Sequence, residues 1–133
     1  MSSAGNILIV DDEPHVRRFL SLVVRSLGPF QVHEAADGEA ALALYAALSP
    51  APALVLLDVN MPGIDGIETL RRLRAAGYEN PAAMLTSLAN RQTIEDAISA
   101  GADHYLRKDT PKDEILAALR ALLPAAPDGA PSA

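Results

Sequence analysis

Apolar and polar residues alternate along this chain in two distinct patterns. Uninterrupted apolar runs, such as residues 7–10 (ILIV) and 53–57 (ALVLL), are typical of strands buried on both faces of a sheet. Between such runs, apolar residues recur every three or four positions, which predicts helices with one buried face. The first of these stripes consists of Val16, Phe19, Leu20, Val23, Val24 and Leu27. The two patterns follow each other five times, so we predict five strand–helix units.

Strands are expected at residues 7–10, 30–35, 53–57, 82–86 and 103–106, and helices at about 14–27, 39–48, 67–77, 91–101 and 110–123. Gly28 is placed to cap the first helix, and the Thr110 hydroxyl to cap the last one, with Pro111 as its first residue. Buried strands that alternate with amphipathic helices predict an α/β fold, a doubly wound parallel sheet with helices on both faces. Residues 6–123 form the domain, residues 1–5 an extension, and residues 124–133 a disordered Pro/Ala-rich tail or the start of a linker.

Composition narrows the functional classes. The formal net charge is −6, from 17 acidic and 11 basic residues, which disfavours binding to nucleic acid by this chain alone. The absence of cysteine excludes disulfides and thiolate metal sites. There is neither an apolar run of membrane-spanning length nor a signal-peptide pattern, so we expect a cytoplasmic protein without a membrane partner.

Polar side chains follow several of the predicted strands. Asp11 and Asp12 follow the first, Asp58 and Thr86 end the third and fourth, and Lys108 follows the fifth. In a parallel sheet these ends meet at one edge, where ligands bind. Three carboxylates there would repel one another without a cation, and oxygen ligands favour Mg²⁺. A lysine and a hydroxyl at the same edge suit a phosphoryl group.

Each of these residues also has a simpler interpretation. An Asp-Asp pair before a helix is commonly turn chemistry, a lysine is commonly a solvated charge, and Tyr105 would be a half-buried strand aromatic. These interpretations leave the shared edge unexplained, so we favour a site.

Taken together, these residues make the chain resemble a response-regulator receiver domain of two-component phosphorelay signalling. The resemblance rests on Asp11-Asp12, Asp58 within LLDVNMPGIDG, Thr86-Ser87 after MLT, and Lys108 in GADHYLRKD. The spacings of 47, 28 and 22 residues between Asp11, Asp58, Thr86 and Lys108 agree with that family. The resemblance implies a flavodoxin-like fold with strand order 2-1-3-4-5.

The resemblance also implies roles. Asp58 would accept a phosphoryl group from the phosphohistidine of a sensor histidine kinase or a phosphotransfer protein. Mg²⁺ would be held by Asp11, Asp12, Asp58 and the backbone carbonyl of Asn60. Lys108 would pair with a phosphoryl oxygen. Such a domain is a signalling switch that catalyses only its own phosphorylation and dephosphorylation.

Thr86 and Tyr105 match the switch pair of the family. Their movement would change the surface formed by the fourth helix, fifth strand and fifth helix, and that surface would control an effector domain, a partner protein or a homodimer. Asn60 and Leu88 match positions that tune hydrolysis, and an apolar Leu88 predicts a phosphate of moderate to long lifetime.

The chain departs from the family at Asp109, where receivers usually carry proline after a cis peptide bond, so we expect a trans bond here. The sequence KDTP, residues 108–111, resembles receivers of regulators with a helix-turn-helix DNA-binding domain. Whether the chain is cut from such a regulator or stands alone is left open by the sequence.

Three other functions compete with this one. A Mg²⁺-dependent aspartyl phosphatase would need an acid where Asn60 stands. A flavodoxin-like electron carrier would need a phosphate loop where the acids of residues 11–13 lie. A phosphorylation-independent interaction module of receiver type would have lost an acid or the lysine, and none is lost here.

Overall fold

The sheet of this protein has five parallel strands in the order β2-β1-β3-β4-β5. The computed structural model describes residues 5–87 and 90–123. The strands are β1 (Asn6–Val10), β2 (Gln31–Ala35), β3 (Leu54–Leu57), β4 (Ala82–Thr86) and β5 (His104–Arg107). The helices are α1 (Pro14–Arg25), α2 (Gly38–Ala47), α3 (Gly66–Ala75), α4 (Arg91–Ser99) and α5 (Lys112–Leu122).

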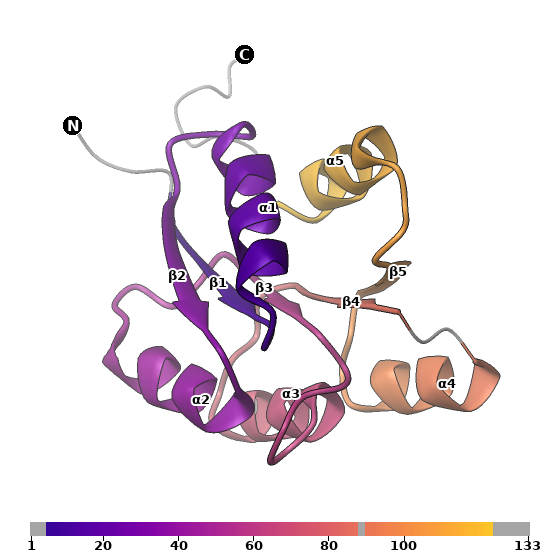
Figure 1. Cartoon of the computed structure of the whole chain (residues 1–133). Coiled ribbons are helices and arrows are strands. Elements are labelled where there is room, and N and C mark those ends of the chain that lie inside the picture. The colour runs from indigo at the N-terminus through magenta and orange to yellow at the C-terminus, as the bar shows by residue number, and fades with distance from the viewer. Residues whose placement is uncertain (1–4, 88–89, 124–133) are drawn as a thin grey trace.

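Helices cover both faces of the sheet, with α1 and α5 on one face and α2, α3 and α4 on the other (Figure 1). The strand side chains alternate between two cores. Ile7 and Ile9 pack with the residues of α1 and α5. Leu8 and Val10 pack on the opposite face with those of α2, α3 and α4. Because β1 is buried on both faces, it carries an uninterrupted apolar sequence.

The strand register brings polar residues together at one edge. Val10 lies opposite Leu57, and the Asp58 N–H donates to the Val10 carbonyl at 2.9 Å. The next residues of both strands, Asp11 and Asp58, therefore emerge side by side at the carboxyl end of the sheet.

The predicted fold class and strand order are confirmed, and all ten elements are found within two residues of their expected ends. Of the predicted extension, residues 1–5, the first four lie outside the described residues, as does the predicted tail of residues 124–133. Within the part of the chain that the structure describes, no helix combines the length and apolarity needed to cross a membrane.

Two predicted helix caps are wrong. Helix α1 ends before Gly28, because Ser26 takes the capping role and its hydroxyl donates to the Val23 carbonyl at 2.6 Å. Helix α5 begins at Lys112 with Pro111 as its N-cap, and no side chain caps it. Thr110 instead belongs to the preceding turn, where its N–H donates to the Arg107 carbonyl at 3.0 Å.

Arg74 fastens the edge of the molecule opposite the acidic residues. Its guanidinium donates to the backbone carbonyls of Tyr78, Asn80 and Gly101, at 3.0, 2.6 and 2.7 Å. It also donates to the Asp103 carboxylate at 3.1 Å. One side chain at the end of α3 thus ties together the α3–β4 and α4–β5 connections.

Replacing Arg74 by alanine should lower the free energy of unfolding by about 2–3 kcal/mol, since several acceptors lose a charged donor. Urea denaturation measures this loss. Arg71 is the matched control, because its pair with Glu68 at 3.0 Å is exposed. Arg71→Ala should cost about 0.5 kcal/mol or less. Equal losses in the two variants would contradict the assigned role of Arg74.

Candidate functional site

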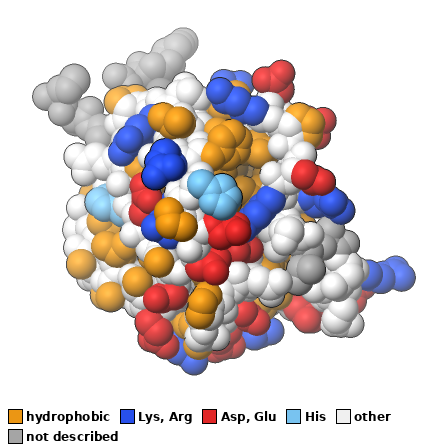
Figure 2. All heavy atoms as spheres, in the orientation of Figure 1, with side chains coloured by type: hydrophobic (Ala, Val, Ile, Leu, Met, Phe, Trp, Pro, Cys, Tyr) orange, Lys and Arg blue, Asp and Glu red, His pale blue; other side chains and the backbone are white. Residues whose placement is uncertain are grey.

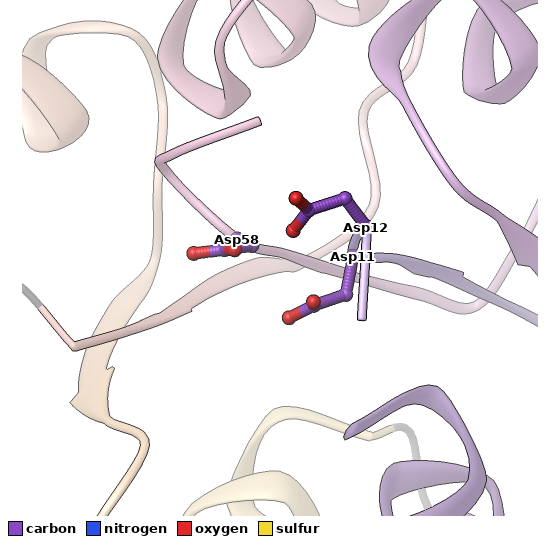
Figure 3. Close-up of side chains that lie close together, drawn as sticks. All are labelled: Asp11, Asp12 and Asp58. Carbon is purple, nitrogen blue, oxygen red and sulfur yellow. The ribbon is translucent and has the colours of Figure 1, made fainter. Parts of the chain in front are cut away.

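Three carboxylates gather where β1 and β3 end. Asp11 and Asp12 follow β1, Asp58 follows β3, and a carboxylate oxygen from each lies within 4.8 Å of the others. Figure 3 shows the three side chains reaching the same space beside the strand ends. Asp11 and Asp58 are buried, whereas Asp12 is exposed. A cluster of oxygen ligands open to solvent on one side fits a hard divalent cation that keeps part of its water shell.

A single ammonium group bridges this cluster. Lys108 Nζ lies 2.9 Å from Asp11 Oδ2, 3.0 Å from Asp58 Oδ2 and 3.1 Å from Glu13 Oε1. The Lys108 side chain is 18% exposed, so these contacts are more shielded than ordinary surface pairs. On the face shown in Figure 2, acidic side chains gather near the middle of the surface with basic side chains beside them. Four acids, including Asp12, surround one lysine, which leaves a net negative charge suited to a cation.

The surroundings of the cluster raise the pKa of both Asp58 and Lys108, for different reasons. Burial raises the pKa of Asp58 above its usual value, the hydrogen bond from Lys108 opposes this, and the charge of Asp11 adds to the increase. Burial lowers the pKa of Lys108, but its hydrogen bonds with Asp11, Asp58 and Glu13 outweigh burial and raise that pKa overall. Lys108 is therefore held as a cation, whereas the surroundings of Asp58 disfavour its ionised form.

Thr86 and Tyr105 lie on the neighbouring strands. Thr86, at the end of β4, is fully buried, and its carbonyl accepts from the Lys108 N–H at 2.8 Å. Tyr105 lies on β5 opposite Met84 and packs partly buried against the core beneath α2, α3 and α4. Burial and the negative charge of Asp58 both raise the pKa of its hydroxyl. The predicted pair thus lies on adjoining strands next to the acidic cluster.

In the turn after β5, Asp109 pairs with a neighbouring arginine. The Asp109 carboxylate accepts from Arg107 Nε and Nη2, both at 3.0 Å, so it pairs with Arg107. The only cis peptide bond among the described residues is Ser49–Pro50, so the bond after Lys108 is trans, as predicted.

The loop after Asp58 depends on a glycine that the sequence did not single out. The Gly66 N–H donates to the Val59 carbonyl at 2.8 Å, and a Cβ atom at Gly66 would collide with the Asp58 carbonyl oxygen. Any larger residue would push the start of α3 away from Asp58. The sequence signal was present in the dipeptide Asp65-Gly66, but it reads equally well as an ordinary turn.

The structure thus brings Asp11, Asp12, Asp58 and Lys108 together, with Thr86 and Tyr105 beside them. Asn60 is exposed, and its backbone lowers the pKa of Asp58 through a hydrogen bond, while its carbonyl as a metal ligand stays a prediction. Leu88 lies outside the described residues. The contact of Glu13 with Lys108 was not predicted, because it depends on the direction that the Glu13 side chain takes after folding.

The raised pKa of Asp58 predicts that Asp58→Asn stabilises the metal-free protein at pH 7. Between the unfolded and folded pKa values the native chain retains a proton that the unfolded chain loses, so native stability falls as the pH rises through this window. The variant avoids that loss and should melt at a higher temperature than the native chain at pH 7 in a chelating buffer. Melting temperatures at pH 7 and pH 4 test this. The difference should shrink at pH 4, and a variant less stable than the native chain at pH 7 would contradict it.

Comparison with known proteins identifies a single family over nearly the whole chain. Residues 7–120 match the family model described as the response regulator receiver domain. The regulatory protein AtoC of Escherichia coli is 39% identical over 115 residues, which are 86% of this chain and 24% of AtoC. The response regulator MprA of Mycolicibacterium vanbaalenii is 42% identical over 117 residues, 88% of this chain and 49% of MprA.

A solved structure has the same fold. The BeF3-activated N-terminal receiver domain of Klebsiella pneumoniae RstA superposes with a TM-score of 0.79 at 32% identity, over 88% of this chain and 97% of that one. The chain spans between a quarter and half of the length of the two curated relatives. With a family model that matches residues 7–120 and a fold shared with a solved receiver, this chain belongs to the response regulator receiver domains of two-component systems.

Proposed function

We propose that the chain accepts a phosphoryl group on Asp58 from the phosphohistidine of a sensor histidine kinase or a phosphotransfer protein, in a reaction that depends on Mg²⁺. The observation that carries this proposal is the contact of Lys108 Nζ with Asp58 Oδ2 at 3.0 Å inside a cluster of three aspartates. A buried carboxylate beside both a fixed cation and open oxygen ligands suits phosphoryl transfer better than a purely structural role.

The transfer would begin with attack of an Asp58 carboxylate oxygen on phosphorus. As the new P–O bond forms, the P–N bond to the kinase imidazole breaks, and the electron pair returns to the imidazole nitrogen. Lys108 would turn from the Asp58 carboxylate to an oxygen of the transferred group. Asp11, Asp12, Asp58 and the carbonyl of Asn60 would hold Mg²⁺. The ion supplies positive charge that offsets the oxygens of the phosphoryl group.

The response would start at Thr86. Its hydroxyl would move to hydrogen-bond a phosphoryl oxygen, and Tyr105 would turn inward into the space released. The register that pairs Met84 with Tyr105 and Thr86 with Arg107 supports coupling between these strands. The surface made by α4, β5 and α5 would change and control an effector domain, a partner protein or a second copy of the chain.

The relatives suggest the setting of this switch. Because AtoC and MprA extend well beyond the matched region, a domain outside it is the natural effector, and KDTP favours a regulator with a helix-turn-helix domain. The chain itself, with a net charge of −6, would not contact nucleic acid. We place its activity in the cytoplasm, where it would catalyse only its own phosphorylation and dephosphorylation.

The proposal is tested by incubating the protein with acetyl phosphate, with and without Mg²⁺, and measuring intact mass. One phosphoryl group should be added when Mg²⁺ is present, and the rate should fall at least about 100-fold without it, since the charges of the transferred group would go uncompensated. Asp58→Asn, which keeps the shape of the side chain, should not be labelled.

The matched control is Asp113→Asn, which removes an exposed acid in the first turn of α5. This variant should be labelled like the native chain. Labelling of Asp58→Asn at the native rate would exclude Asp58 as the acceptor. Failure of the native chain to react, under conditions that label another receiver, would favour the phosphorylation-independent interaction module.

A further inference from the structure

Arg17 contacts both the backbone of the acidic cluster and a residue of β2. Its Nη1 donates to the backbone carbonyl of Asp11 at 2.6 Å, and its Nε donates to Glu34 Oε1 at 3.1 Å. The Arg17 side chain is only 17% exposed. The guanidinium therefore joins three elements, namely α1, the end of β1 and β2.

The contact with Asp11 falls on the peptide unit that links Asp11 to Asp12. Asp11 has several other restraints, because its N–H donates to the Ala35 carbonyl at 3.1 Å and its carboxylate contacts Lys108. The Asp12 carboxylate makes no hydrogen bond or ion pair with any other residue that the structure describes. The position of Asp12 is therefore set by its backbone. Arg17 contacts that backbone at the Asp11–Asp12 peptide bond.

We infer that Arg17 is a positioning residue for Mg²⁺. Anchored by Glu34, its guanidinium hydrogen-bonds the Asp11 carbonyl and so fixes the peptide that presents Asp11 and Asp12 to the ion. This inference rests on the proposed function, since it assumes that the ion binds at the three aspartates. Arg17 would act through this peptide and would not touch the ion or the phosphoryl group.

If only the charge of Arg17 mattered, its removal would change Mg²⁺ affinity in the opposite direction, so an experiment can separate the two explanations. A cation near a metal site repels the metal, so removing Arg17 would tighten Mg²⁺ binding if its charge were what mattered. Loss of positioning would weaken binding instead. Arg18, the next residue of α1, is exposed and forms none of these contacts, so its removal changes the net charge equally without loosening the peptide.

The experiment titrates Mg²⁺ alone into the full chain, without phosphodonor, and follows backbone amide resonances to obtain the Kd. Arg17→Gln should raise the Kd about five- to tenfold, the effect of losing one or two hydrogen bonds from a charged donor. Arg18→Gln should change it less than about twofold. Arg17→Lys keeps the charge but cannot span both acceptors with a planar fork, so its Kd should lie between those of the native chain and Arg17→Gln.

A second readout separates positioning from general damage. In acetyl phosphate labelling, the Mg²⁺ concentration for half-maximal rate should rise by the same factor in Arg17→Gln. The rate at saturating Mg²⁺ should stay within about twofold of native, because the ion restores the geometry once bound. A slower saturated rate with an unchanged Kd would overturn the inference.

Two further outcomes would overturn the inference, and a third would refute the proposed function. An unchanged or lower Kd in Arg17→Gln overturns the inference, and if that variant does not fold, a native Kd in Arg17→Lys does so. Failure of the native chain to bind Mg²⁺ at all would instead refute the proposed function, and is seen before any variant is compared.

Discussion

Lys108 joins the ends of β1, β3 and β5 through contacts of 2.9 to 3.1 Å with Asp11, Asp58 and Glu13. Without the lysine these carboxylates would repel one another at such short distances. The ammonium group offsets that repulsion. Because one lysine cannot neutralise four acids, the cluster remains attractive to a further cation. The same interaction thus accounts for the integrity of the metal-free site and for its proposed affinity for Mg²⁺.

The fold places these groups with little freedom. Parallel pairing sets Val10 beside Leu57, so the aspartates that follow them emerge together at one edge of the sheet. Gly66 allows α3 to approach the Asp58 carbonyl, and Arg17 donates a hydrogen bond to the Asp11 carbonyl. Arg74 secures the opposite edge of the sheet. The site is therefore held by backbone contacts rather than by the functional side chains alone.

Much of this was predictable from the sequence, because strands buried on both faces and amphipathic helices leave clear periodic patterns. Asp11, Asp12, Asp58 and Lys108 could be grouped because the ends of parallel strands share an edge. The contacts of Glu13 with Lys108 and of Arg17 with Asp11 could not be predicted, since they depend on side-chain directions after folding. The cap assigned to Gly28 failed because Ser26 already caps α1 two residues earlier. The cap assigned to Thr110 failed because α5 begins with Pro111 as its N-cap, without any side-chain hydrogen bond.

The chemical nature of the phosphorylated product tests the central claim most directly. A ³¹P NMR spectrum of the protein, recorded after reaction with acetyl phosphate and Mg²⁺ and again after hydroxylamine, distinguishes an acyl phosphate from a phosphate ester. The account predicts a single protein resonance that hydroxylamine removes, because a carboxyl–phosphate bond is cleaved by this nucleophile. A resonance that survives hydroxylamine would place the phosphoryl group on a hydroxyl such as that of Thr86, and would contradict the role given to Asp58.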